Sequence, residues 1–241
     1  MTAPHFFVEA LTVDDVVLLS PEDSRHALGS LRLRPEAEVS LADGGGRVAT
    51  GTLSGAESGR ALVRVHHVDH RPRKGPAVSI AVAAPRGQRL AWAVQKLAEL
   101  GVDEVVVLEA ERSVREWDPE RVESAAARLR SVARESAMQS HQPFITEVVA
   151  GTAIEQAMAS GGDPVLMLHP AAVTPLSAAL PPETWGVRLL IGPEGGFSER
   201  EFEAAGDAGV NHVSLGAGTL RTETAAIVGA ALVLAHYGRL G

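Results

Sequence analysis

The chain has 241 residues, of which 45% are hydrophobic and 4% aromatic, and it contains no cysteine. The lack of cysteine excludes a disulfide scaffold, a thiolate zinc site, an iron–sulfur cluster and a cysteine nucleophile. With 22 Lys and Arg against 30 Asp and Glu, the net charge of −8 does not by itself indicate a nucleic-acid-binding protein. No apolar run reaches the roughly 18–20 residues that span a bilayer, and no signal peptide is recognised, so the sequence predicts a soluble, cytoplasmic protein.

The amino-terminal part of the chain is predicted to form a small β-barrel with one inserted helix. The helix is expected to begin at Ser20–Asp23, where a hydroxyl can cap the first turn and Pro21 fits its geometry. Short β-branched or alternating runs separated by glycine-rich turns predict strands at His5–Val8, Ala37–Ala42, Arg47–Leu53 and Ala61–Val68. Residues 1–75 carry 9 Lys and Arg, 10 Asp and Glu and 5 of the 9 His, which is compatible with a polyanionic partner and equally with ordinary surface charge.

The segment Arg71–Pro76 reads as a linker, because it has two prolines, a glycine and three charges without periodicity. After it, apolar strands alternate with helical patterns, which predicts a parallel sheet covered on both faces. The predicted strands are Val78–Ala84, Glu104–Glu109, Ile145–Val149, Val165–His169, Val187–Ile191 and His212–Leu215. The predicted helices are Gln88–Leu100, Pro119–Gln139, Thr152–Ala159, Glu199–Ala208 and Glu223–Tyr237. Ligands of such sheets bind beyond the carboxyl ends of the strands.

The turn Gly192–Phe197 directly follows a predicted buried strand. Its three glycines allow the backbone to approach a ligand closely, although a tight strand-to-helix turn needs glycine in any case. Ser198 and Glu201 are spaced to form a capping box for the next helix. The spacing matches neither a phosphate-binding P-loop nor the glycine fingerprint of a dinucleotide fold, so both of these sites are disfavoured.

The segment Leu220–Ala225 leads into the last predicted helix. Thr222 is predicted to be the helix N-cap, and Glu223 complements the helix dipole. Arg221 places a cation where the dipole disfavours it, which indicates an anionic partner or an oxygen that gains charge during a reaction. His169 at a strand end is predicted to line a pocket, and no metal site is predicted because no second ligand lies at a suitable spacing. The arginines of Pro119–Gln139 are interpreted as a solvated helix face in preference to an RNA contact.

Together these segments resemble the RsmE family, the 16S ribosomal RNA uridine-N3 methyltransferases of the SPOUT class. The resemblance rests on the paired segments Ile191–Ser198, Leu215–Gly216 and Leu220–Ala225. Further similar stretches are Gln95–Val102, Gln139–Ser140, His26, Leu31–Arg32 and Asp43–Gly44, so the resemblance spans almost the whole chain.

The resemblance implies a fold, a cofactor and partners. It implies a PUA-like RNA-binding β-barrel over residues 1–72 and a SPOUT α/β domain with a deep trefoil knot over residues 73–241. S-adenosyl-L-methionine would be the methyl donor. The partners would be 16S rRNA in the small ribosomal subunit and a second copy of the chain, with the active site at the homodimer interface.

The resemblance also implies roles for particular residues. Arg221, Glu223 and Glu194 would be catalytic. The cofactor would contact Leu168, His169, Ile191, Gly192, Pro193, Glu194, Gly195, Gly196, Leu215, Gly216, Leu220 and Thr222. RNA would contact His26, Arg32, Arg86, Arg89, Gln139 and Ser140.

The sequence departs from the family pattern at several positions. Gly218 and Thr219 stand where the family usually has Arg-Ile, and Gln142 and Thr146 replace an Arg and a Pro. A usual Lys appears as Arg86, and cations that could compensate are Arg89, Arg112 and Arg134. Two alternatives therefore stay open, namely a non-catalytic RNA-binding protein on the same scaffold and a SPOUT enzyme that modifies another RNA position.

Overall fold

The computed structural model describes residues 3–85, 87–113, 119–159 and 161–240. The chain divides into two compact units, one formed by Met1–Arg73 with Ala137–Ile145 and the other by Lys74–Ser136 with Thr146–Gly241. The segment 137–145 thus packs with the first unit, whereas the sequence interpretation assigned it to the second. The physical reason is apolar contact, since Ala137 and Ile145 pack in a small cluster with Phe7 and Ala42.

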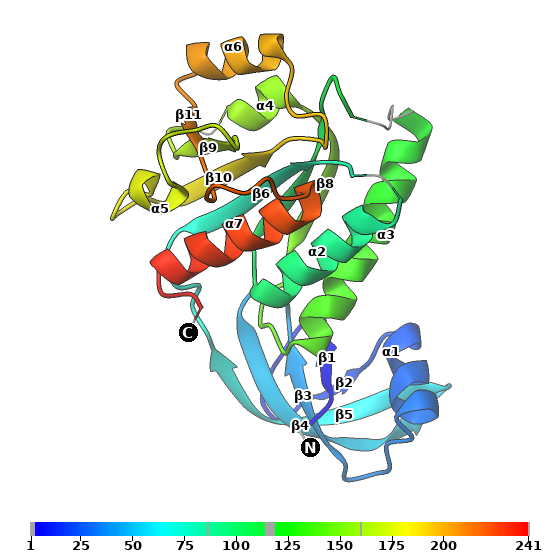
Figure 1. Cartoon of the computed structure of the whole chain (residues 1–241). Helices are drawn as coiled ribbons and strands as arrows, with labels where there is room; N and C mark the ends of the chain where they lie inside the picture. Colours follow the sequence, from blue (N-terminus) through cyan, green and yellow to red (C-terminus); the bar gives the residue numbers. More distant parts are fainter. Residues whose placement is uncertain (1–2, 86, 114–118, 160, 241) are drawn as a thin grey trace. The chain divides into compact units, whose positions relative to one another are not determined.

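The first unit is built on a sheet with the strand order β1-β3-β4-β5-β2 (Figure 1). Its strands are β1 (His5–Phe7), β2 (Val16–Leu18), β3 (Glu38–Ala42), β4 (Arg47–Glu57) and β5 (Arg60–His70). The β1–β3 pair is parallel and the other pairs are antiparallel. Alternate side chains of these strands, including Leu41, Leu53 and Val63, are fully buried and form one core.

Two elements of the first unit were not predicted, namely strand β2 and the π-helical turn that follows helix α1. Strand β2 is a three-residue edge strand whose side chains are largely exposed, so it carries no alternating pattern. Helix α1 (Pro21–Arg25) is capped by Ser20 as predicted, with a distance of 3.0 Å from the Asp23 amide to the Ser20 Oγ. It continues into a π-helical turn at His26–Ser30, and side-chain patterning does not reveal that widening.

Glycine is required at the turn that follows β3. Gly46 has φ +105°, and a Cβ there would lie 2.8 Å from the Phe144 ring and 2.7 Å from the Arg71 carbonyl oxygen. The guanidinium of Arg73 lies 4.3 Å from the centroid of the same ring. Phe144 therefore fills a space that only a residue without a side chain leaves open.

The second unit contains a parallel sheet with the strand order β11-β9-β10-β6-β7-β8, as the alternating pattern predicted. The strands are β6 (Ala77–Ala83), β7 (Glu104–Glu109), β8 (Glu147–Ala153), β9 (Val165–Leu168), β10 (Gly186–Ile191) and β11 (Asn211–Val213). Strand β8 extends through Thr152 and Ala153, which were expected to be helical, and it begins only at Glu147. Ile145, the predicted start, instead belongs to the first unit.

Helices cover both faces of the parallel sheet, and Figure 1 shows α2, α3 and α7 together across one of them. The helices are α2 (Arg89–Leu100), α3 (Pro119–Gln139), α4 (Ile154–Met158), α5 (Leu176–Ala179), α6 (Glu199–Asp207) and α7 (Thr222–His236). Val82 and Leu189 pack beneath α2 and α7, while Ala83 and Leu190 pack in a second core with α4 and α6. The short helix α5 was not predicted, since one turn carries too little periodicity. Within the described ranges, no helix combines the length and apolarity needed to cross a membrane.

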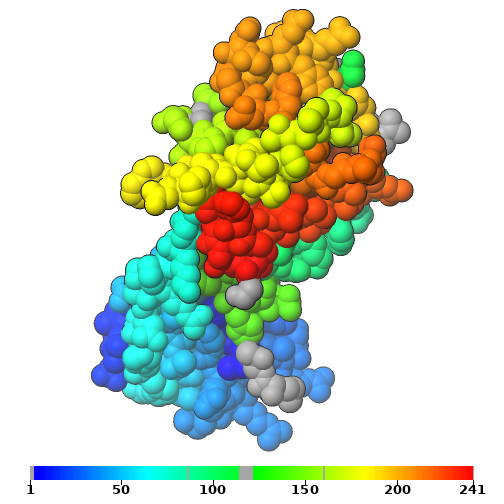
Figure 2. Space-filling model, turned by 60° about the vertical axis from the view of Figure 1, so that its left-hand side comes forward, coloured from blue at the N-terminus to red at the C-terminus, as the bar shows by residue number. Residues whose placement is uncertain are grey.

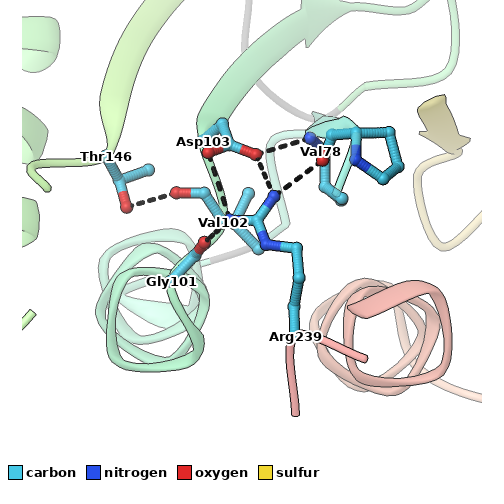
Figure 3. Close-up of polar contacts among 7 residues, drawn as sticks. Val78, Gly101, Val102, Asp103, Thr146 and Arg239 are labelled. Carbon is cyan, nitrogen blue, oxygen red and sulfur yellow. Dashed lines mark hydrogen bonds and ion pairs between the residues drawn. The ribbon is translucent and has the colours of Figure 1, made fainter. Parts of the chain in front are cut away.

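The amino-terminal edge of the parallel sheet is closed by Arg239, a largely buried arginine that follows α7 (Figure 3). Arg239 Nη1 lies 2.5 Å from Asp103 Oδ2, and Nη2 donates to the Gly101 carbonyl oxygen at 2.7 Å. The same Asp103 oxygen accepts from the backbone N–H of Val78 at 2.6 Å. Burial lowers the pKa of Arg239 from its usual value. The segment after α7 is therefore fixed to the start of β6 and to the turn before β7.

Candidate functional site

A pocket lies at the opposite, carboxyl-terminal edge of the sheet. Its walls come from the segments after β9, β10 and β11, so the three strand ends singled out in the sequence do meet in space. The space inside, including its open mouth, is about 710 Å³. The pocket is lined by Leu168, His169, Pro170, Ile191, Gly192, Pro193, Glu194, Gly196, Phe197, Phe202, Leu215, Gly216, Gly218, Thr219, Leu220, Thr222 and Ala225.

The turn after β10 owes its shape to its glycines. A Cβ on Gly192 would lie 3.1 Å from the Phe197 ring, so the backbone passes close to a buried aromatic side chain. Gly196 has φ +70°, and its N–H donates to the Pro193 carbonyl oxygen at 2.8 Å. The predicted capping box is present, with 3.2 Å from the Glu201 amide to Ser198 Oγ and 2.6 Å from the Ser198 amide to Glu201 Oε2.

One wall of the pocket carries an aromatic cluster that sequence reasoning missed. The Phe202 ring meets the ring of His169 edge-on at 4.8 Å between centroids, and it meets Phe197 at 6.0 Å and His212 at 5.2 Å. Phe202 lies one helical turn after Ser198, the N-cap of α6. This spacing from the capping box is the signal in the sequence that could have placed Phe202 beside the turn after β10. His169 lines the pocket as expected. The described residues hold no group of three His, Asp, Glu or Cys side chains that could bind a metal ion.

The start of α7 differs from the expectation in one respect. Arg221 occupies the N-cap position, and Thr222, the predicted cap, is the first helical residue. The Thr222 hydroxyl instead donates to the Gly192 carbonyl oxygen at 3.0 Å. The turn after β10 and the last helix are thereby joined beside the pocket. Arg221 is exposed and stands outside the pocket lining.

Arg89, at the start of α2, lies between two carboxylates. Its Nε is 3.6 Å from Glu223 Oε1, and its Nη1 is 4.0 Å from Glu194 Oε1. The side chain of Glu223 is 8% exposed, and its Oε2 has no hydrogen-bond partner among the described residues. Glu194 is less buried and lines the pocket, whereas Glu223 does not. The three charged side chains bring α2, the β10 turn and α7 together at the pocket edge.

The proposed cofactor residues and the observed lining overlap closely, but they are not identical. Gly195 is absent from the lining, and its carbonyl oxygen accepts a hydrogen bond from Arg112. The lining residues that the sequence interpretation left out are Pro170, Phe197, Phe202, Gly218, Thr219 and Ala225. Gly218 and Thr219, where the sequence departs from the family pattern, thus belong to the pocket wall.

The expected RNA-binding residues fall into different places. His26, Arg32 and Gln139 are exposed in the first unit, and Ser140 is partly buried there. Arg86 lies outside the described residues. Arg89 belongs to the second unit and makes the ion pairs given above.

Comparison with known proteins gives a consistent picture. Residues 73–234 match the RNA methyltransferase domain family. A ribosomal RNA small subunit methyltransferase E of Mycobacterium bovis is 32% identical over 235 residues, which cover 95% of this chain and 90% of that protein. A methyltransferase of Legionella pneumophila with bound S-adenosylmethionine superposes with a TM-score of 0.89 at 27% identity, covering 98% of both chains. A ribosomal RNA small subunit methyltransferase E of Neisseria gonorrhoeae, also bound to S-adenosylmethionine, gives 0.89 at 26% identity over 98% of both chains.

Proposed function

Since the chain belongs to the ribosomal RNA small subunit methyltransferase E family, we propose that it transfers a methyl group from S-adenosylmethionine to N3 of a uridine in 16S rRNA. The observation that carries the proposal is the meeting of three strand-end segments around one pocket, beside Arg221 and two carboxylates. A cytoplasmic location follows from the proposed substrate, because small ribosomal subunits are found there.

The pocket fits a nucleoside-containing cofactor. Its walls combine apolar side chains such as Leu168, Ile191 and Leu215 with glycine backbone at Gly192, Gly196 and Gly216. Exposed backbone groups can hydrogen-bond a base or ribose, and apolar side chains can cover their faces. The cofactor supplies a methyl group activated on a sulfonium centre. The residues proposed to hold it are the lining residues of the three segments, together with Gly195, which stands outside the lining.

Methyl transfer to uridine N3 needs alignment and charge control. The N3–H proton must pass to a base as the nitrogen forms its bond to the methyl carbon, and the carbon–sulfur bond breaks with its electrons returning to sulfur. Positioning the reacting atoms in line contributes several kcal/mol to such a reaction. N3 also lies on the pairing edge, so the base must be unpaired or flipped out.

Three charged residues are proposed to serve this step. Arg221 stands at the helix N-cap, where a cation is disfavoured without an anionic partner, and it would stabilise charge that develops on the uracil oxygens. Glu194, which lines the pocket, or the more buried Glu223 would accept the N3 proton. Arg89 lies between these two carboxylates and offsets their mutual repulsion.

The decisive experiment is methyl incorporation into small subunits that lack the modification, followed by mass spectrometry of the nucleosides. The Arg221→Ala variant is expected to lose methylation and to keep its calorimetric affinity for S-adenosylmethionine within about twofold, because Arg221 stands outside the pocket lining. Arg200→Ala, on the exposed side of α6, is the matched control. Undiminished turnover in Arg221→Ala would remove this residue from the mechanism.

The same experiment separates the alternatives. Gly218 and Thr219 line the pocket where the family usually has Arg-Ile, and this departure favours a non-catalytic RNA-binding protein as the second candidate. Cofactor binding without incorporation would support that candidate. A methyl group on a different nucleoside position would support a SPOUT enzyme with another target.

Two finer features of the architecture are part of the proposal. A trefoil knot in the second unit is supported by the adjacency of β10, β9 and β11, whose following segments all converge on the pocket. A PUA-like RNA-binding barrel is supported by the mixed sheet of the first unit, with α1 between β2 and β3. His26, Arg32, Gln139 and Ser140 remain the proposed RNA contacts of that unit, and Arg86 and Arg89 those of the other.

A homodimer with the active site at its interface is also proposed. Helix α7 is apolar around its whole circumference, which is typical of a helix buried on all sides. Yet Leu232 on α7 is 43% exposed and Trp92 on the neighbouring α2 is 48% exposed. Figure 2 shows the red atoms of α7 forming part of the molecular surface. Analytical ultracentrifugation at micromolar concentration is expected to give about twice the 25.2 kDa chain mass, and a monomer would contradict the proposal.

A further inference from the structure

The carboxylate of Glu201 makes one more contact than its helix cap requires. Glu201 is 3% exposed, and its Oε2 completes the capping box with the Ser198 amide. A capping box uses only that contact. The other oxygen, Oε1, accepts from the backbone N–H of Glu111 at 2.9 Å, 90 positions earlier in the chain. Glu201 therefore links the segment after β7 to the segment after β10.

A second link runs in the opposite direction. Arg112, next to Glu111, donates from Nη1 to the Gly195 carbonyl oxygen at 3.1 Å and to the Phe197 carbonyl oxygen at 3.3 Å. Hydrogen bonds from a charged donor are stronger than neutral ones. We call this set the β7–β10 clamp, formed by Glu111 and Arg112 on one side and by Gly195, Phe197 and Glu201 on the other.

The clamp holds the part of the pocket wall whose backbone has the greatest conformational freedom. Gly195 and Gly196 are adjacent glycines, and glycine populates more backbone conformations than any other residue. Gly196 and Phe197 line the pocket, whereas Gly195 turns its carbonyl towards Arg112. Without the clamp, this segment would have to be ordered when a ligand binds, and that ordering weakens binding.

The geometry points to Arg112 and Glu201 as positioning residues that pre-order the β10 turn for cofactor binding. This inference rests on the proposed function, because it takes S-adenosylmethionine as the occupant of the pocket. It assigns Arg112 to the support of the β10 turn, whereas the sequence interpretation offered it as a compensating RNA cation. Neither residue touches the reacting atoms, so the effect is expected in cofactor affinity rather than in the chemical step.

The test is a set of variants measured by calorimetry and by steady-state methylation. Arg112→Met keeps the aliphatic stem, which packs 3.6 Å from a Cβ position on Gly195, and removes both donated hydrogen bonds. Because Arg112 is exposed, this variant is expected to fold. We expect the Kd and KM for S-adenosylmethionine to rise about tenfold, with kcat at saturating cofactor and KM for RNA within about twofold. Arg112→Lys, which retains a charged donor, is expected to recover part of the loss.

Two further variants sharpen the test. In Glu201→Gln, an amide NH₂ replaces one carboxylate oxygen and faces either the Glu111 N–H or the Ser198 N–H, so one of these two hydrogen bonds is lost. We expect the same selective loss of cofactor affinity. The double variant is expected to be no worse than the more affected single variant, because either change opens the same clamp. Arg200→Met is the matched control, since Arg200 also pairs with Glu111 but lies on the exposed face of α6.

The outcomes separate this inference from the proposed function. If the unmodified protein does not bind S-adenosylmethionine, the proposed function fails. If it binds the cofactor and Arg112→Met binds equally well, only the positioning role is overturned. A rise in KM for RNA alone would make Arg112 an RNA contact and would likewise overturn it. A loss of thermal stability at unchanged cofactor affinity would show a merely structural clamp.

Discussion

The two edges of the parallel sheet are constructed in different ways. At the amino-terminal edge, the side chains of Arg239 and Asp103 are 11% and 10% exposed and lie 2.5 Å apart, and both also hydrogen-bond backbone groups of Val78 and Gly101. At the carboxyl-terminal edge, Arg89 is 43% exposed and lies 3.6 Å and 4.0 Å from its two carboxylates. The first edge is a closed network, while the second surrounds an open pocket with glycine turns.

This contrast separates residues that hold the fold from residues that serve the site. A buried ion pair tolerates no loss of one partner, because the remaining charge stays away from water. A half-exposed arginine near two carboxylates can exchange partners at little cost, since water screens it. Substitutions at the amino-terminal edge are therefore expected to change stability, and substitutions at the carboxyl-terminal edge are expected to change ligand binding.

The largest effect is expected from Asp103→Ala. The change leaves the guanidinium of Arg239 buried without its counter-charge, so the free energy of unfolding is expected to fall by about 3–5 kcal/mol. Urea unfolding followed by circular dichroism measures it. Cofactor affinity of the folded fraction, measured at low temperature, is expected to stay unchanged, and a large loss of affinity would break the contrast between the edges.

The second-largest effect concerns the loss of stability in acid, which we expect to arise in the first unit and at neither edge of the parallel sheet. In the first unit, burial and the neighbouring His141 lower the pKa of His5 from 6.5 to about 4. As the pH falls from 6.5 towards 4, the unfolded chain binds a proton that the folded chain refuses. The free energy of unfolding is therefore expected to fall over this window by at most about 3 kcal/mol.

The variant His5→Phe isolates this contribution. It cannot bind a proton at this position, so the pH dependence of urea midpoints between pH 7 and 4 is expected to be shallower than in the unmodified chain. Equal slopes for the two proteins would show that His5 does not carry the acid sensitivity.

Gly192→Ala tests the carboxyl-terminal edge. The new Cβ would lie 3.1 Å from the Phe197 ring, which is 3% exposed and lines the pocket. We expect a stability loss of about 1–2 kcal/mol from overpacking. Displacing Phe197 also changes the pocket wall, so calorimetry is expected to show several-fold weaker cofactor binding. Gly206→Ala, where a Cβ meets nothing within 4 Å, is the matched control.

The smallest effect is expected from Thr222→Val. The change keeps the side-chain shape and removes the hydrogen bond from Thr222 to the Gly192 carbonyl oxygen. Loss of one such bond weakens stability by about 1 kcal/mol. Thermal unfolding with and without S-adenosylmethionine is expected to show a slightly larger loss in the bound state. A loss confined to the free protein would show that this bond does not support the pocket.

Local patterns predicted much of the second unit because its elements are long or strongly apolar. Glu104–Glu109 and Pro119–Gln139 agree with β7 and α3 at both ends, and the capping box at Ser198 is present. The failures lie where a neighbour distant in sequence decides the outcome. Ile145 packs with the first unit instead of starting β8, and Thr222 donates to Gly192 instead of capping α7. Phe202 lines the pocket, although the sequence interpretation did not single it out.

The sequence by itself determined the strand–helix alternation, the parallel sheet and the two glycine-bearing turns after β10 and β11, because these follow from apolar periodicity and from the residues that turns require. Only the tertiary structure decided that Arg112 and Glu201 clamp the β10 turn, that Arg89 lies between Glu194 and Glu223, and that Arg239 closes the opposite edge. Each of these contacts joins residues far apart in the chain. Their distance and burial depend on packing, which no local pattern encodes.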